Sequence, residues 1–237
     1  MKWVLFSLAG VCLLYLNMGD VWAPIWELAT FNDTQSTVFY LLRLPRLFTA
    51  ILVGMALALS GASLQGVLKN PLVEPYILGI SSGAAFGAAL FMAFIPTPIW
   101  GVWAGAVGGF FGALLALFGV YFIVKLSHQS SVLIYVMAGI IMNAMLSAGL
   151  MIVLFSSGDQ GWGIMSWMMG DLSKSNGVAL TLFLVVLVIS FVVLQNQAHN
   201  INKLALGDEV ASTLGVSPSK TRKRVFFIAS ILTGLAV

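Results

Sequence analysis

Charged side chains are scarce in this chain, and their scarcity excludes an ordinary soluble fold. Only 8% of the 237 residues are Asp, Glu, Lys or Arg, whereas 60% are hydrophobic. A soluble domain carries about 25% charged residues and needs them to cover its surface. We therefore expect lipid to surround most of the chain. Because spanning segments must satisfy their backbone groups internally, the sequence predicts an all-α polytopic membrane helix bundle, a single domain over residues 1–237.

Cysteine and histidine are also rare, which excludes several kinds of site. The single cysteine, Cys12, cannot form an internal disulfide, and His128 and His199 lie far apart, so we expect no metal site. The net charge of +3 follows no basic stripe, so we expect no nucleic-acid partner. No P-loop or H-E-x-x-H motif occurs. The chain is therefore expected not to be an enzyme and to bind no cofactor of its own.

Six apolar runs are long enough, or nearly so, to cross a membrane as helices. They cover residues 3–19, 47–66, 76–95, 99–124, 132–155 and 178–195. A seventh run begins near Val225 and reaches Val237, which gives 13 residues. Such a helix rises only about 20 Å, against a hydrocarbon core of about 30 Å. We therefore expect six full spans plus part of a seventh.

Small residues recur at every fourth position in three of these runs. The three stripes are Gly54/Ala58/Ala62, Gly79/Gly83/Gly87 and Gly101/Gly105/Gly109. Residues at this spacing share one helix face and let two backbones approach closely. The stripes predict tight helix packing, with a direct role in lining a pathway as the alternative.

The interiors of the six runs contain no Asp, Glu, Lys, Arg or His. Proton-coupled transporters usually carry such residues inside the membrane. If the protein transports, its energy is therefore expected to come from a partner, although sodium coupling through backbone carbonyls stays open. Asn143 is the most polar side chain deep inside a run, and it either bonds a neighbouring helix or lines a pathway.

The distribution of basic residues predicts the orientation. With a cytoplasmic N-terminus, the outer loops hold only Arg43, Arg46 and Lys174. The inner loops then hold eight basic residues, namely Lys2, Lys69, Lys125, Lys203, Lys220, Arg222, Lys223 and Arg224. This asymmetry follows the positive-inside rule and favours a cytoplasmic N-terminus.

The segment from Leu206 to Val216, within the long loop 196–224, predicts a short helix. Asp208 and Glu209 suit a first helical turn, Gly215 suits its end, and Pro218 prevents continuation. Val210, Ala211 and Leu214 share an apolar face, which is expected to dock either on the membrane domain itself or on a separate cytoplasmic subunit.

Several segments together resemble the FecCD/BtuC-type permeases, which import iron siderophores, haem and vitamin B12 with a binding protein and an ATPase. The resemblance is carried by residues 42–46 (LRLPR), 54–61, 70–75 (NPLVEP), 78–84, 138–139, 167–170 and 206–216. No single segment is specific, but their order and spacing span most of the chain.

The resemblance implies roles for four residues. Arg43 and Arg46 match the pair that receives acidic residues of the extracytoplasmic substrate-binding protein, with anchoring to lipid phosphates as the alternative. Asn70 and Leu72 match positions at the cytoplasmic gate, with a plain interhelical turn as the alternative.

The resemblance also implies that the segment around Gly207–Gly215 rests in a cleft of the ATPase. The residues concerned are Gly207, Asp208, Glu209, Val210, Leu214 and Gly215. Family members have ten spans, so by this resemblance the chain is C-terminally truncated, lacking three further spans and a further basic docking residue after Val237.

The expected function is that of a permease subunit of an ABC importer in the bacterial cytoplasmic membrane. It would move a ferric siderophore inward, with haem and cobalamin as the nearest alternative substrates. Its expected partners are a separate ATP-binding subunit that hydrolyses the ATP, the substrate-binding protein and a second permease subunit, identical or homologous. An ion-coupled secondary transporter and a non-transporting membrane scaffold are the competing hypotheses.

Overall fold

The structure is a computed structural model that describes residues 2–18, 32–95, 103–127, 132–172 and 177–237. Gly101, His128 and Lys174, named above, lie outside these ranges. Within the described ranges every regular element is a helix. The chain forms two compact units, which are described separately: Met1–Leu52 with Asp171–Leu184, and Val53–Gly170 with Val185–Val237.

The first unit contains helix α1 (Lys2–Asn17), the short helix α2 (Asp33–Thr37), the π-helical segment η2 (Val38–Arg43) and the start of α3 (Leu44–Leu68). The last three run on as one helix of 36 residues from Asp33 to Leu68. It begins well before residue 47 because Asn32 and Gln35 form a capping box, with hydrogen bonds of 2.8 and 3.1 Å.

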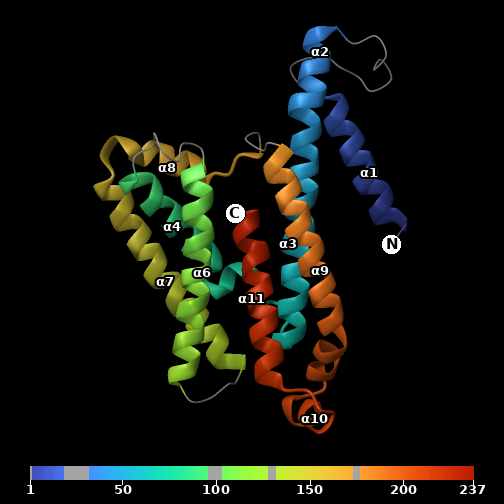
Figure 1. The fold of residues 1–237 in the computed structure, drawn as a ribbon, viewed down its shortest axis with the longest axis vertical. Helices are drawn as coiled ribbons and strands as arrows, with labels where there is room; N and C mark the ends of the chain where they lie inside the picture. Colours follow the sequence, from blue (N-terminus) through green and yellow to red (C-terminus); the bar gives the residue numbers. More distant parts are fainter. Residues whose placement is uncertain (1, 19–31, 96–102, 128–131, 173–176) are drawn as a thin grey trace. The chain divides into compact units, whose positions relative to one another are not determined.

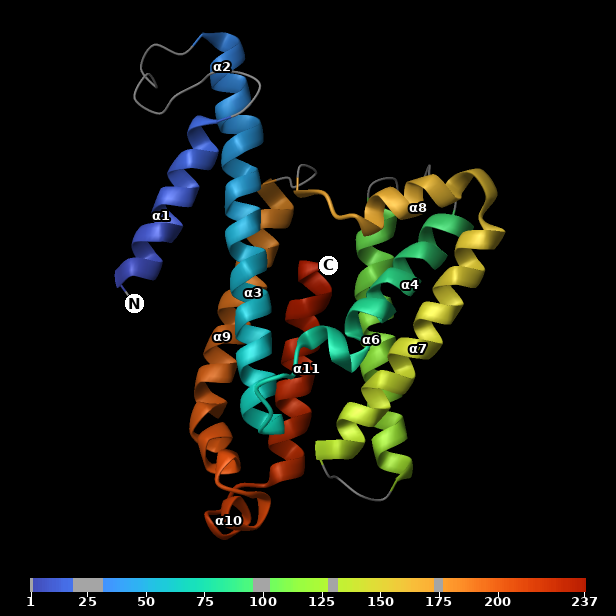
Figure 2. The same ribbon diagram turned by 180° about the vertical axis from the view of Figure 1, so that it is seen from behind.

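The second unit holds the rest of α3, the part of α9 after Leu184 and the remaining helices (Figures 1 and 2), while the start of α9 belongs to the first unit. Helix α4 packs against α6 and α7, and α6 also packs against α11. Helices α8 and α10 lie toward opposite ends of this unit (Figure 1). The bounds are η3 Pro75–Leu78, α4 Ile80–Phe94, α6 Trp103–Leu126, α7 Val132–Ser156, η4 Gly158–Gln160, α8 Gly161–Met168, α9 Gly177–Ala205, α10 Asp208–Thr213 and α11 Pro218–Ala236.

The expectation of several apolar membrane helices is confirmed. Four helices in the described part are long and apolar enough to cross a membrane: the continuous helix Asp33–Leu68, α6, α7 and α9. Helices α1 and α4 are apolar but shorter, at 16 and 15 residues. The predicted run 76–95 is interrupted because Gly79 adopts φ +75° between η3 and α4. The count of six full spans stays a prediction.

Glycines bring α4 and α6 into direct backbone contact. A Cβ on Gly83 would lie 2.5 Å from the carbonyl oxygen of Gly112, and one on Gly108 would lie 2.5 Å from that of Gly87. Only glycine allows this approach, so the packing predicted for Gly83 and Gly87 is confirmed. Their partners are Gly108 and Gly112, because the predicted stripe at Gly105 faces Trp167 of α8 instead.

The loop predicted over 196–224 is mostly helical. Helix α9 continues to Ala205, and α11 begins at Pro218 instead of near Val225. Proline is well suited to the first turn of a helix, where its missing N–H costs nothing, so Pro218 starts α11 as well as separating it from α10. The connection is thereby reduced to a short segment built around α10.

Candidate functional site

Two glycines define the short helix α10. Gly207 precedes it with φ +123°, and Gly215 follows it with φ +79°. Both values lie in the region that side chains other than glycine rarely adopt. Asp208 and Glu209 occupy the first turn, where the helix dipole favours negative charge. The short helix expected in this segment is confirmed.

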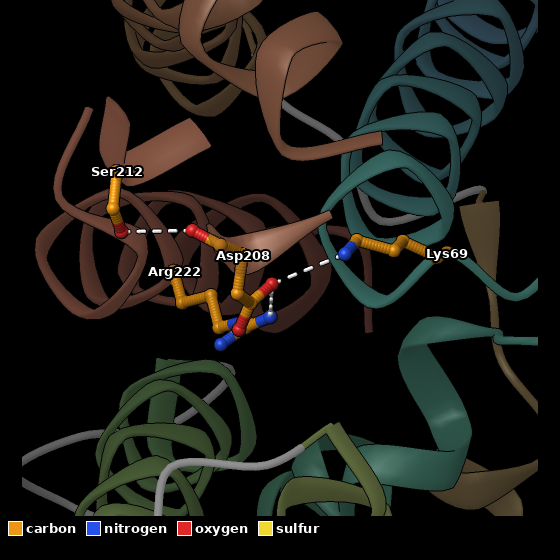
Figure 3. A network of polar contacts seen from close by, with 4 residues as sticks. All are labelled: Lys69, Asp208, Ser212 and Arg222. Atoms are coloured by element: carbon orange, nitrogen blue, oxygen red, sulfur yellow. Dashed lines mark hydrogen bonds and ion pairs between the residues drawn. The ribbon is translucent and has the colours of Figure 1, made fainter. Parts of the chain in front are cut away.

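Asp208 joins three elements of the second unit (Figure 3). Its Oδ1 accepts a hydrogen bond from Nζ of Lys69, at the end of α3, over 3.1 Å. The same oxygen accepts one from Nη2 of Arg222, in the second turn of α11, over 2.8 Å. Ser212 closes the turn by donating to the main-chain oxygen of Asp208 over 2.8 Å. We call Lys69, Asp208 and Arg222 the charge triad.

Burial differs sharply among the three side chains of the charge triad. The Arg222 side chain is fully buried, whereas those of Asp208 and Lys69 are 42% and 29% exposed. Partial burial acts to raise the pKa of Asp208, but the hydrogen bonds and charges of Lys69 and Arg222 outweigh it. The pKa of this carboxyl therefore lies below its ordinary value of 3.8, and Asp208 is ionised at neutral pH.

The turn after α3 begins at the lysine of the charge triad. Lys69 has φ +52°, and the next residue, Asn70, accepts a hydrogen bond on Oδ1 from the Leu72 N–H over 2.9 Å. Gln65 donates from Nε2 to the carbonyl oxygens of Pro71 and Val73, over 3.0 and 3.3 Å. These bonds fix the turn, and they leave the Leu72 side chain 78% exposed. The gate role of Asn70 and Leu72 stays a prediction.

The apolar residues around α10 divide into two sets. Ala211 is fully buried and forms a cluster with Leu204 and Val216. Three other side chains remain exposed, and we call them the apolar edge: Leu206 at 65%, Val210 at 44% and Leu214 at 47%. These three residues lie four positions apart in the sequence. Ala211 thus docks α10 on its own chain, while Val210 and Leu214, expected on the same face, stay open.

Lys69 and Arg222 were not identified as site residues from the sequence, where they counted only as cytoplasmic positive charge. Lys69 and Asp208 are 139 positions apart, so no spacing pattern could pair them. A weaker signal existed in Arg222, because an arginine four residues into an apolar helix has to find an acceptor when it is buried.

The predicted docking arginines lie in the first unit and differ in their surroundings. Arg43 ends η2 and is only 6% exposed, and its Nη1 donates to the Leu16 carbonyl oxygen at the end of α1 over 2.8 Å. Arg46 is partly exposed, although its Nε is buried and has no hydrogen-bond partner among the described residues. Arg46 is therefore the better placed of the two to meet a partner protein, and docking stays a prediction for both.

Asn143 lies on an exposed face of α7. Within the described ranges its side chain makes no hydrogen bond, so the expected bond to a neighbouring helix is not formed inside this part of the chain. Its assignment to a pathway or to contact with a further subunit stays a prediction. No group of three or more His, Cys, Asp or Glu residues gathers in the part of the chain that the structure describes.

Comparison with known proteins places these features in a family. The model of the FecCD transport family matches residues 5–237. The hemin transport system permease HmuU of Yersinia pestis is 33% identical over 240 residues, covering 99% of this chain and 71% of that protein. The molybdate import permease MolB of Haemophilus influenzae is 32% identical over 235 residues, covering 96% and 68%.

A solved structure has a similar fold. It is a chain of an ABC transporter, described as of the metal-chelate type, in an inward-facing conformation, with a TM-score of 0.85 and 28% identity. The match covers all of this chain and 75% of that one. The chain spans between 66% and 71% of the length of the first three curated relatives. By the family match and these similarities, the chain belongs to the FecCD transport family.

Proposed function

We propose that this chain acts as a permease subunit of an ABC importer in the cytoplasmic membrane. Family membership supports a transport role. Helix α10 supports the use of a separate subunit that hydrolyses ATP. The observation that carries the proposal is the apolar edge at α10, because Val210 on this short helix and Leu206 and Leu214 beside its two ends are exposed. The helix is itself fixed to the end of α3 and to α11. Such an edge fits a cleft on a cytoplasmic ATP-binding subunit.

The lack of Asp, Glu, Lys, Arg and His in α4 and α7 supports an external energy source. Proton-driven carriers usually need such groups within the membrane to couple substrate movement to the gradient. ATP hydrolysed by a partner can instead move α10 and the helices attached to it, so that the pathway opens alternately to each side.

The proposed partners follow from the assignment as an importer permease with a cytoplasmic N-terminus. A cytoplasmic N-terminus places α10 on the side of the ATPase, and Arg46, with Arg43, on the side of an extracytoplasmic substrate-binding protein. The exposed face of α7, including Asn143, suits a second permease subunit or the pathway between two subunits. The charge of Arg46 would mainly orient the binding protein.

The proposed substrate is a ferric siderophore, with haem and cobalamin as the nearest alternatives. Hemin transport by HmuU and the metal-chelate type of the solved transporter support this class. MolB, at nearly the same identity, imports molybdate, so the substrate has to be assigned by measurement. Ligand-stimulated ATP hydrolysis with candidate chelates and molybdate makes that assignment.

The test is reconstitution of the full chain with its cognate ATP-binding subunit and binding protein in liposomes. Val210→Asp with Leu214→Asp should lower recovery of the ATPase on the purified permease about tenfold or more, because it puts charge into an apolar contact. Ser217→Asp is the matched control, since Ser217 is exposed just beyond α10 and lies off the apolar edge. Normal recovery in the double variant would remove α10 as the docking element. Uptake that requires an ion gradient and proceeds without the ATPase would contradict the importer hypothesis and support a secondary transporter.

A further inference from the structure

The charge triad links α10 to the two neighbouring helices at the same end of the second unit. One carboxylate oxygen of Asp208 holds both cations, Lys69 over 3.1 Å and Arg222 over 2.8 Å (Figure 3). A displacement of α10 therefore pulls on the end of α3 and on the start of α11 together.

The link to α3 acts on a turn that is already rigid. Lys69 comes directly before Asn70, whose side chain caps the Leu72 N–H, and Gln65 ties the same turn back to α3. Because the turn is braced on both sides, a pull on Lys69 moves it as a body. Leu72 belongs to this body and is 78% exposed.

The link to α11 is the stronger of the two. The Arg222 guanidinium is fully buried, and hydrogen bonds between charged groups strengthen where water is excluded. Helix α11 in turn bonds α3 deep in the unit, where Ser60 and Thr233 hydroxyls lie 3.1 Å apart. Motion that enters at Asp208 is thus passed along α11 as well as into the turn.

The Lys69 link is poorly suited to a purely stabilising role. Asp208 and Lys69 are both partly exposed, and ion pairs of this kind contribute little to folding stability. The buried cluster of Leu204, Ala211 and Val216 already holds α10 on the chain. The Lys69 link can therefore be broken without releasing α10, whereas loss of Asp208 also removes a partner of the buried Arg222.

We propose that Asp208 is a positioning residue that transmits displacement of α10 to the turn at Asn70–Leu72 and to α11, and so sets how much substrate moves per ATP hydrolysed. This inference rests on the proposed function and goes beyond it. Docking of the ATPase is assigned to the apolar edge, and transmission is assigned to the charge triad. The two roles are therefore separable by substitution.

The experiment compares Asp208→Asn with Glu74→Gln in the reconstituted complex. Glu74 is an acid of the same unit, and it is exposed and forms no ion pair among the described residues. Both variants lose one negative charge from this unit. We expect Asp208→Asn to keep wild-type ATPase recovery and to lower uptake per ATP hydrolysed about tenfold, as loss of charge-assisted hydrogen bonds predicts. Glu74→Gln should match the wild type in both measurements.

Two further variants separate transmission from folding. Lys69→Met removes the link to the turn and leaves the Asp208–Arg222 pair. It should therefore lower the ratio of uptake to ATP hydrolysed while ATPase recovery stays normal. Asp208→Glu keeps the charge and should restore most of the ratio. A merely structural role would lower uptake and hydrolysis in parallel and leave their ratio unchanged.

Each outcome decides between the two proposals. A wild-type ratio in Asp208→Asn, or a parallel loss of ATPase recovery, would overturn the transmission role and leave the importer intact. A wild-type complex that shows no ligand-stimulated hydrolysis and no uptake would overturn the importer and the transmission role together.

Discussion

The carboxylate of Asp208 accepts hydrogen bonds from two cations, Lys69 and Arg222. Because its pKa is lowered in the folded chain, its stabilising contribution is complete above the ordinary value of 3.8 and is lost as the pH falls through the lowered pKa. The difference in thermal unfolding between the wild type and Asp208→Asn should therefore be constant from about pH 5 to 8 and shrink only below about pH 4. Unfolding in detergent across this pH range measures it. A difference that disappears between pH 5 and 7 would contradict the lowered pKa.

A second prediction at this scale concerns hydroxyl groups between α3 and α11. Ser60 is fully buried, and its Oγ lies 3.2 Å from the Ala229 carbonyl oxygen and 3.1 Å from Thr233 Oγ1. Interhelical hydrogen bonds in membrane proteins contribute about 0.6 kcal/mol on average and reach about 2 kcal/mol. Ser60→Ala should therefore lower the free energy of unfolding by about 0.5–2 kcal/mol.

The matched control is Ser63→Ala on the same helix. Ser63 is also buried, but its Oγ donates to the Ser60 carbonyl oxygen within its own helix, over 2.8 Å. Its loss should cost less, because no contact between helices is removed. Denaturant titration in mixed micelles compares the two variants. Equal losses would mean that the Ser60 bonds to α11 add nothing measurable.

At the scale of elements, the contact between α4 and α6 depends on the absence of side chains. A Cβ on Gly112 would meet the Gly83 carbonyl oxygen and would lie 2.8 Å from Gly87 Cα. Because the clash is with backbone, the helices must separate, and overpacking of this kind costs about 1–3 kcal/mol. Gly112→Ala should lower the unfolding midpoint accordingly. Gly54→Ala is the control, since a Cβ there would meet nothing within 4 Å, and an equal loss in both variants would refute the contact.

The sequence predicted elements well where local chemistry decides them. Acidic residues in the first turn and Gly215 at the end were enough to predict α10, and long apolar runs predicted α6, α7 and most of α9. Polarity marks where a helix leaves the lipid, whereas hydrogen bonding decides where it ends. For that reason the continuations to Ala205 in α9 and back to Pro218 in α11 were missed.

The candidate site was only partly predictable for a different reason. The α10 residues were found because they are contiguous, but the cations that hold Asp208 come from helices distant in sequence. Packing between helices also determines which glycines meet, and Gly105 packs on the Trp167 side chain where the stripe predicted a close approach of two backbones. Such pairings follow from tertiary arrangement and leave no periodic signal in a single sequence.

At the scale of the whole molecule, the proposals require α8 and α10 to face opposite sides of the membrane. Both belong to the second unit and lie toward its opposite ends (Figure 2). In a Cys12→Ser background, which removes the only cysteine, single cysteines at Asp159 and Ser212 report the two sides, and both positions are exposed.

Membrane-impermeant maleimide should label Asp159→Cys in intact cells and Ser212→Cys only after the membrane is opened. The reason is that a cytoplasmic ATPase can reach the apolar edge only if α10 is inside, together with Lys69 and Arg222, as the positive-inside rule favours. Labelling of Ser212→Cys from outside would place the charge triad away from any source of ATP. That result would overturn the ATPase contact and the transmission role at once, whatever the family resemblance implies.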